Sequence, residues 1–446
     1  MRSPQASGPV SLGLFAVLVV LYLGMRLFLL GAAGYEVDVN QYKEWALGAG
    51  LMGFPGIYEN TSADYPPASL GVFWLVGKAF VLSQPPFAPG EISVEVVPTW
   101  SIRLPHLVFD LLLGFLLYRV VAFGGLWGTR RQGPGWGRLA ALAYWWNPAV
   151  LFGSAWWGQF DSMHAFLAVA AIAALGGDRW ILSAAALSAA GLSKPLAAPL
   201  VPILVVAAAL RRGLPGVAMA GVSGFLVAVV LFAPFWLTGR GVAALQRVLV
   251  DVDIMPFTSL NAHNLWWWIG AWQPANAPGF GGLTPRDWGV GIFLLVAGFL
   301  LVRSRGWLRQ AQEAEYRAGL FVLAAALISA FFFFSTHMHE NHLFLAVPLL
   351  VAVSGRSRRL ASLAIGASIC VFVNEFLHDP VLLLELPGWL AAPSGEVVPG
   401  LQGPYSSLQV WGSRLNAGLA AVVFVGTALE VWGWSRTDSR AASSGF

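Results

Sequence analysis

The chain has 446 residues, of which 57% are apolar and only 11% are charged, with a formal net charge of +4. Soluble domains carry roughly 25% charged residues, so this composition excludes a soluble protein. A transmembrane helix needs about 20 apolar residues, and the total of about 254 apolar residues is enough for about twelve such helices. A chain with only one or two membrane anchors is excluded for the same reason.

The single cysteine, Cys370, lies in an apolar stretch, which excludes a disulfide framework and a thiolate metal site. We attribute the positive net charge to basic loops on the cytoplasmic side, where Lys and Arg concentrate, and we expect no nucleic-acid partner. The apolar run near the N-terminus lacks a small-residue cleavage site and is predicted to be a retained first span.

Twelve apolar runs bounded by Arg, Gly or Pro are predicted to cross the membrane. They cover about residues 10–32, 103–123, 138–154, 161–176, 180–193, 196–210, 215–238, 288–302, 318–335, 341–354, 359–376 and 411–434. A thirteenth run, 67–84, contains Lys78 and is ambiguous in length.

Charge placement decides whether this thirteenth run crosses. Four basic clusters should share the cytoplasmic side, namely Arg130/Arg131, Arg211/Arg212, Arg303/Arg305/Arg309 and Arg356/Arg358/Arg359. They do so only if 67–84 lies along the outer interface or re-enters. We therefore predict an all-α polytopic membrane protein, a single integral membrane domain over 1–446. It has about twelve transmembrane helices, one outer interfacial or re-entrant helix and both termini in the cytoplasm.

This topology leaves three long segments on the outer face, 33–102, 239–287 and 377–410. All seven histidines fall in these outer segments or near the outer ends of the predicted helices. Long loops of distinct composition tend to be functional, so we expect the functional site on the outer face.

The first outer segment supplies a candidate general base, Asp38, a few residues after the first span. A carboxylate there can accept a proton from a hydroxyl nucleophile, although a solvated loop acid is the plainer alternative. We assign Tyr42 and Trp45 to substrate binding. Asp64 and Tyr65 precede two prolines that begin the 67–84 helix, and Asp64 either contacts substrate or caps that helix.

Four further polar residues lie at or near the predicted outer ends of helices. Arg103 and Asp110 are seven residues apart and share a helix face. Ionisable residues in spans usually face a cavity or each other; Arg103 alternatively snorkels to the interface, whereas Asp110 needs a partner. Gln159 and Asp161 follow a tryptophan pair that suits the interfacial aromatic belt, and they remain as candidate substrate contacts.

Lys194, followed by a helix-breaking proline, is a candidate phosphate ligand at the outer surface. Snorkelling of its side chain is the alternative. Asn261 and Asn264 precede three tryptophans. Amides and aromatic faces together suit a sugar ring, which needs in-plane hydrogen bonds and an apolar stacking surface.

The densest polar cluster comprises His337, His339, Glu340 and His342 at the start of the 341–354 run. Helical zinc sites place two histidines at i and i+4, whereas these fall at i, i+2 and i+5. We therefore predict no metal or other cofactor, with a divalent cation only weakly supported. The cluster is interpreted as hydrogen-bonding and phosphate-contacting.

The order of these motifs resembles the GT-C glycosyltransferases, polytopic enzymes that take sugars from polyprenyl- or dolichyl-phosphate. The similarity is greatest to bacterial GT-C proteins and to the glucosyltransferases that build the lipid-linked oligosaccharide of N-glycans. It extends from residue 38 to 342 and comprises an acid after the first span, DYPP, an Arg…Asp helix, WGQxD, a Lys-Pro turn, NAxNLWW and MHEN.

The resemblance implies that Asp38 is the catalytic base and that Lys194 lies near the donor phosphate. It also matches DYPP to 64–67, the Arg…Asp pair to Arg103 and Asp110, and the His-Glu pair to His339 and Glu340. A basic residue often follows that pair in the family, but Asn341 stands there in this chain. Neutralisation of the donor phosphate charge then depends more on Lys194, Arg103 and the neighbouring histidines.

The expected reaction is inverting transfer of a sugar, a hexose such as mannose or glucose, from a polyprenyl-phosphate donor. The acceptor is a hydroxyl of a glycan, glycolipid or protein at the outer face of a bacterial plasma membrane. The alternative is a transporter or flippase for a lipid-linked or anionic substrate, but the sequence shows no internal repeat of the kind transporters often carry. A structural membrane protein would not need so many polar residues on one side.

Overall fold

The computed structural model describes residues 8–85, 93–128, 130–250, 256–310, 313–378 and 407–443, and this part of the chain is mostly helical. The α-helices are α1 (Leu12–Leu29), α2 (Glu36–Met52), α3 (Ile57–Asn60), α4 (Pro67–Ser83), α5 (Thr99–Gly124), α6 (Pro134–Trp145), α7 (Asp161–Gly176), α8 (Trp180–Gly191), α9 (Val201–Leu237), α10 (Gly241–Leu249), α11 (Leu265–Gly270), α12 (Pro285–Gln310), α13 (Glu313–Phe334), α14 (Ala346–Val353), α15 (Arg358–Phe376) and α18 (Ser407–Ser443). The shorter elements are η1 (Phe54–Gly56), η2 (Val94–Val96), η3 (Val150–Trp157), η4 (Pro195–Leu200), η5 (Phe280–Gly282), η6 (Ser354–Arg356), β1 (Ser259–Leu260) and β2 (Met338–His339).

Within the described ranges, seven helical stretches are long and apolar enough to cross a membrane. They are Leu12–Leu29, Thr99–Gly124, Pro195–Leu237, Pro285–Arg309, Ala314–Phe334, Arg358–Phe376 and Leu408–Trp434. Large apolar side chains such as Phe28, Val230 and Leu295 are at least 70% exposed on these stretches. Such surfaces are stable in lipid rather than in water, and the helices are compatible with an integral membrane protein. Shorter apolar helices at Pro67–Ser83, Asp161–Gly176, Trp180–Gly191 and Ala346–Arg356 accompany them.

The longest of these stretches, Pro195–Leu237, consists of two helical arms. Gly213 separates them with non-helical angles of φ 67° and ψ −163°, a left-handed φ that glycine adopts without strain. Arg212 beside this glycine pairs with Asp178, whereas Arg240 after the second arm pairs with Glu59. The two arms agree with the predicted runs 196–210 and 215–238.

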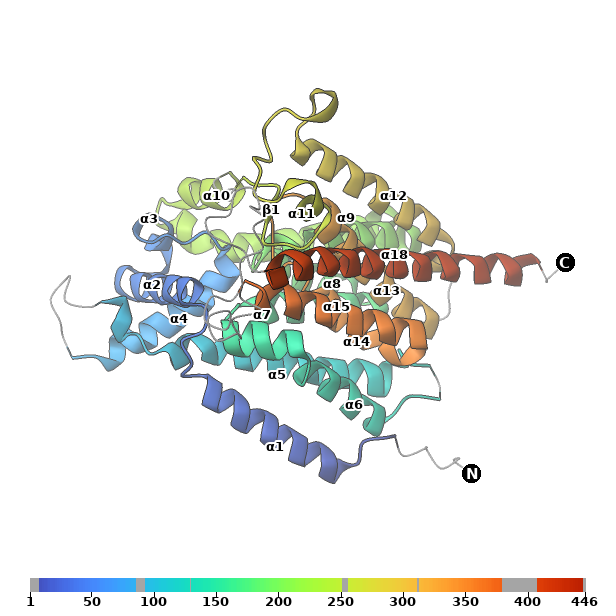
Figure 1. The fold of residues 1–446 in the computed structure, drawn as a ribbon, viewed down its shortest axis with the longest axis horizontal. Coiled ribbons are helices and arrows are strands. Elements are labelled where there is room, and N and C mark those ends of the chain that lie inside the picture. Colours follow the sequence, from blue (N-terminus) through green and yellow to red (C-terminus); the bar gives the residue numbers. More distant parts are fainter. Residues whose placement is uncertain are drawn as a thin grey trace.

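The bundle has two chemically different ends. Arg131 donates a hydrogen bond to the carbonyl of Gly355, and Arg211 donates one to that of Leu308, so each of the four arginine clusters lies beside another one. We call this the arginine end; the beginning of α1 and the end of α18 lie there, at the right of Figure 1. Helices α2, α3, α4 and α10 lie at the opposite end (Figure 1).

The first long segment, 33–102, is more helical than its sequence indicates. In addition to α4, which falls where the 67–84 helix is predicted, it contains the mixed-polarity helix α2. The two helices touch at Gly50 and Gly77, where a Cβ on Gly50 would lie 2.6 Å from the Gly77 backbone. Only glycine permits so close an approach of two backbones. This α2–α4 pair lies beside the site described below.

Two predicted runs differ from the observed elements. The 138–154 run is not one helix, because α6 ends at Trp145 and the π-helical η3 follows it. The 341–354 run begins its helix only at Ala346, so His339 and Glu340 lie on β2 and in the turn after it, not on a helix. Strand β2 pairs in parallel with β1, with Leu260 opposite His339. Most of the predicted 377–410 loop lies outside the described residues.

Candidate functional site

Asp38 lies in the first turn of α2, and two side chains from a distant segment hold its carboxylate. Oδ2 of Asp38 accepts hydrogen bonds from Trp157 Nε1 at 3.0 Å and from Gln159 Nε2 at 2.5 Å. Within the described residues, no side chain donates to the other carboxylate oxygen. Burial raises the pKa of Asp38 to about 6, against the opposing hydrogen bond from Trp157. The indole of Trp157, assigned from sequence to an aromatic belt, is therefore part of the site.

Gln159 connects Asp38 to the rest of the site. Its Oε1 accepts a hydrogen bond from Asn341 Nδ2 at 2.9 Å, and the same amide nitrogen donates to Asp161 Oδ2 at 2.6 Å. Asp161 in turn accepts a 2.6 Å hydrogen bond from Lys194 Nζ through Oδ1. Gln159 and Asp161 flank the start of α7, so residues from four parts of the sequence meet in one network.

Lys194 is a buried cation at the turn between α8 and η4. Burial opposes its charge, but the carboxylate of Asp161 raises the pKa of Lys194 above its usual value. The turn is anchored because Ser69 Oγ donates to the carbonyl of Ser193 at 2.9 Å. The ammonium also lies 5.4 Å from the centre of the Tyr65 ring, a cation–π distance. The structure therefore fixes a positive charge here.

The residues predicted around Asp38 have different roles in the structure. The hydroxyl groups of Tyr42 and Tyr65 are 3.2 Å apart, and Tyr42 also donates to Gln159 Oε1 at 3.4 Å. Trp45 is fully buried behind them and donates to Ser62 Oγ, which makes it a packing residue. Asp64 does not cap α4, whose N-cap, Pro66, has no side-chain bond. Its buried Oδ1 has no hydrogen-bond partner among the described residues.

The histidine-rich motif contributes neutral imidazoles and one protonated acid. Burial lowers the pKa of His339 to about 4, and burial also lowers that of His342, whose Nδ1 accepts the His339 backbone N–H at 3.2 Å. Burial raises the pKa of Glu340 to about 8, and the nearby charge of Asp38 raises it further. His337 has a left-handed φ of 61°, and its Nδ1 lies 2.9 Å from the Thr336 hydroxyl.

No group of three or more His, Cys, Asp or Glu side chains among the described residues could hold a metal ion. Lys194 brings a cationic side chain into the hydrogen-bonded network through Asp161.

Arg103 and Asp110 share a helix, as predicted, but neither joins this network. Arg103 donates to the backbone carbonyls of Leu29, Ala155 and Trp156, and so supports the π-helical segment from behind. Asp110 is fully buried and pairs at 2.7 Å with Arg26 of α1. Hydrogen bonds from Tyr144 at 2.8 Å and Ser154 at 2.5 Å complete its shell. Both residues organise the scaffold around η3.

The two predicted asparagines have mainly structural partners. Asn264 accepts the backbone N–H groups of Trp266 and Trp267 and so caps α11. Asn261, with a φ of 61°, accepts a 3.2 Å hydrogen bond from Trp272 and bridges to His339. The asparagine segment therefore supports the histidine motif through the β1–β2 pair.

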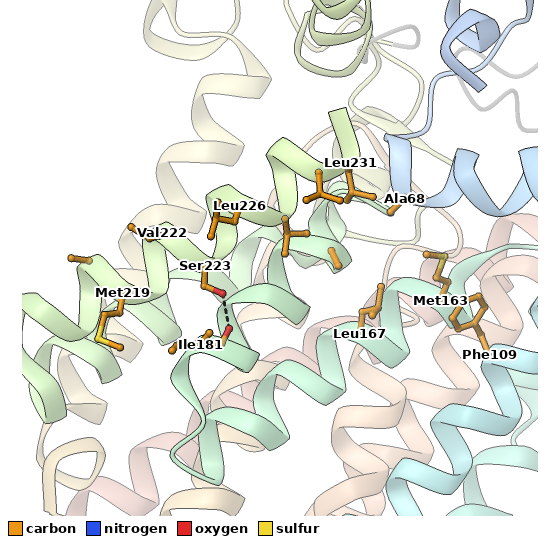
Figure 2. A pocket seen from close by; sticks show the side chains of 14 residues that line it. Ala68, Phe109, Met163, Leu167, Ile181, Met219, Val222, Ser223, Leu226 and Leu231 are labelled. Atoms are coloured by element: carbon orange, nitrogen blue, oxygen red, sulfur yellow. Dashed lines mark hydrogen bonds between the residues drawn. The ribbon is translucent and has the colours of Figure 1, made fainter. Parts of the chain in front are cut away.

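An apolar groove of about 930 Å³ lies on the same side of the bundle as α9. Its lining side chains come from α4, α5, α7, α8 and α9, and Figure 2 shows Phe109, Met163 and Leu167 facing Leu226 and Leu231. Ser223, its polar lining residue, donates its hydroxyl hydrogen to the carbonyl of Ile181 (Figure 2). At the site end the groove reaches Ala68 and Met163, close in sequence to Tyr65 and Asp161.

Three residues of this region were not assigned to the site from sequence. They are Trp157, Asn341 and Glu375. Asn341 stands where the family resemblance implies a basic residue. Glu375 lies at the end of an apolar run, and an acid in such a run was the available signal. No family model and no curated protein matches this chain.

Proposed function

We propose that the chain is a membrane glycosyltransferase that moves a sugar from a polyprenyl-phosphate donor to an acceptor hydroxyl, with inversion. The observation that carries the proposal is the arrangement of Asp38 and Lys194 within one hydrogen-bonded network, at the end of an apolar groove open to lipid. A base, a phosphate-binding cation and a tail-binding groove are the three features that this reaction requires. The order of motifs that resembles the GT-C enzymes supports the same conclusion.

In this reaction the free oxygen of Asp38 accepts the proton of the acceptor hydroxyl as the oxygen attacks the anomeric carbon. The bond from that carbon to the phosphate oxygen breaks, and the lipid phosphate leaves with the electron pair. Lys194 stabilises the phosphate charge. Glu340, protonated at neutral pH because its pKa is about 8, can donate a hydrogen bond to a phosphate oxygen. The apolar groove holds the first isoprene units.

We further propose that about twelve segments cross the membrane and that α4 lies at the outer interface. The arginine end then faces the cytoplasm, with both termini, and the site faces outward. The position of α4 beside α2 at the end opposite the arginines supports this topology (Figure 1). A bacterial plasma membrane is the proposed location, and a glycan, glycolipid or protein is the acceptor.

A transporter or flippase for lipid-linked or anionic substrates is the competing function. Transporter sites lie near the bilayer midplane, whereas the polar network here lies at one end of the bundle. Proteoliposomes with polyprenyl-phosphate donors labelled in the sugar distinguish the two functions. Release of the sugar from the lipid to an acceptor supports the transferase; movement of intact labelled lipid across the bilayer without release contradicts it.

A further inference from the structure

Glu375, near the end of α15, is a buried carboxylate without a partner in the described part of the chain. Its relative exposure is 0%, and neither carboxylate oxygen accepts a hydrogen bond there. No ion pair within the described ranges includes it. The segment 379–406, which follows in sequence, contains no Lys, Arg or His.

Burial of an unpaired acid is energetically unfavourable, and another buried acid of this protein is fully paired. An unpaired buried polar group loses its hydration without compensation, and acids within membrane bundles usually mark functional sites. Asp110 is equally buried but has Arg26, Tyr144 and Ser154 as partners. No side chain in the described ranges fills the hydrogen-bonding capacity of Glu375, and a polar ligand within reach could do so.

The carboxylate of Glu375 lies against the segment that builds the site. A Cβ on Gly153 would lie 2.7 Å and 2.8 Å from its two oxygens, so glycine leaves the room that the carboxylate occupies. The carbonyl of Gly153 accepts the backbone N–H groups of Gly158 and Gln159, both at 2.9 Å. One π-helical residue therefore contacts Glu375 and also positions the side chain that holds Asp38.

Hydrogen bonds place the end of α15 beside the histidine motif. Asn374, the residue before Glu375, donates to the carbonyl of Asn261 and accepts the backbone N–H of His263 at 2.8 Å, and Asn261 bridges to His339. The next residue of that motif, Glu340, is the proposed donor to a phosphate oxygen. Lys194 and Asp161 form the pair that would face the donor phosphate, whereas Asp38 would face the acceptor. A ligand group that reaches Glu375 therefore belongs to the donor.

We propose that Glu375 accepts hydrogen bonds from hydroxyl groups of the sugar carried by the donor and so determines which sugar is transferred. This inference rests on the proposed glycosyltransferase function. A carboxyl group can form several hydrogen bonds with the hydroxyl groups of a ligand. A site built for a hydroxyl also rejects an analogue that lacks it.

The test compares the parent protein with E375Q in proteoliposomes that contain mannose, glucose, galactose or arabinose on polyprenyl phosphate. For the best donor, each deoxy form of the sugar is assayed as well. We expect the parent to discriminate against at least one deoxy donor by about 100-fold or more. E375Q should lower kcat/KM for the complete donor about 10- to 100-fold while leaving that deoxy donor almost unchanged. The exposed acid Glu59, changed to Gln, is the matched control.

A thermal unfolding measurement separates recognition from a structural role. Because neither oxygen of Glu375 has a hydrogen-bond partner in the described ranges, E375Q should leave the unfolding temperature unchanged or raised, whereas loss of a carboxyl group with a structural role would lower it. Equal losses for complete and deoxy donors, or parental selectivity in E375Q, overturn the inference while the transferase function stands. No transfer by the parent from any donor rejects both proposals.

Discussion

Gln159 Nε2 lies 2.5 Å from Asp38 Oδ2, although 121 residues separate the two side chains in the sequence. The amide nitrogen can only donate, so this oxygen of Asp38 is committed and the other is left to a ligand. Gln159 also fixes the orientation of the carboxylate, because its own Oε1 is held by Asn341. The general base is therefore positioned by a chain of amides.

Replacing Gln159 by Leu should reduce kcat about 10- to 100-fold with a smaller change in KM, because an oriented base is worth more in the transition state than in the ground state. Steady-state transfer assays measure both constants. Ser188, which bonds Gly224 away from the site, changed to Ala is the control. Unchanged kcat in the Gln159 variant would show that the amide does not orient the base.

The pH dependence of kcat/KM should report two acids. Asp38, with a pKa of about 6, must be ionised to accept a proton, so activity rises from low pH and is half of its maximum near pH 6. Glu340, with a pKa of about 8, donates a hydrogen bond only while protonated, so activity falls above about 8. E340Q should remove the alkaline limb and keep the acidic one. An alkaline limb that persists in E340Q would assign it to another group.

The Lys194–Asp161 pair should behave as a buried ion pair. Breaking it with K194M or D161N alone should destabilise the protein by about 3–5 kcal/mol, because one charge is left buried and uncompensated. The double variant K194M/D161N should recover most of that stability but no transfer activity. Thermal or denaturant unfolding in detergent measures the stability. Activity in the stable double variant would contradict a phosphate-binding role for Lys194.

Filling the apolar groove should weaken donor binding selectively. Ala189 lines the groove, and A189F should raise KM for long-chain polyprenyl donors about tenfold while changing kcat little, since a few buried methylene groups are worth about 1–2 kcal/mol. A donor with a single isoprene unit should be unaffected. V205F, on the exposed face of the first α9 arm, serves as the control. An equal effect on both donors would remove the groove from the binding site.

Patterns local in sequence predicted much of the fold. Apolar runs predicted most of the long helices, because a lipid-facing helix requires a continuous apolar stretch. They missed α2, whose first half mixes polar and apolar residues, and they merged α6 with η3. A π-helical segment depends on its packing, here on Arg103 against the carbonyls of Ala155 and Trp156, and not on a local signature.

Part of the candidate site could be predicted because polar residues in an apolar membrane chain are energetically costly and usually functional. Asp38, Gln159, Asp161 and Lys194 converge, as expected of residues assigned to one site. Their pairing was not predictable, because contacts across more than a hundred residues leave no trace in a single sequence. For the same reason the sequence does not identify the partner of Asp110, which is Arg26 within the first apolar run.

The most direct test of the account is the rate of sugar transfer by D38N, beside that of E36Q, an exposed acid two residues earlier on the same helix. Both proteins are reconstituted with donors labelled in the sugar, after their unfolding temperatures have been measured and shown to equal that of the parent. The account predicts that D38N loses about 10²–10⁴-fold in kcat and still binds the donor, while E36Q transfers at the parental rate. Transfer by D38N at the parental rate would contradict it.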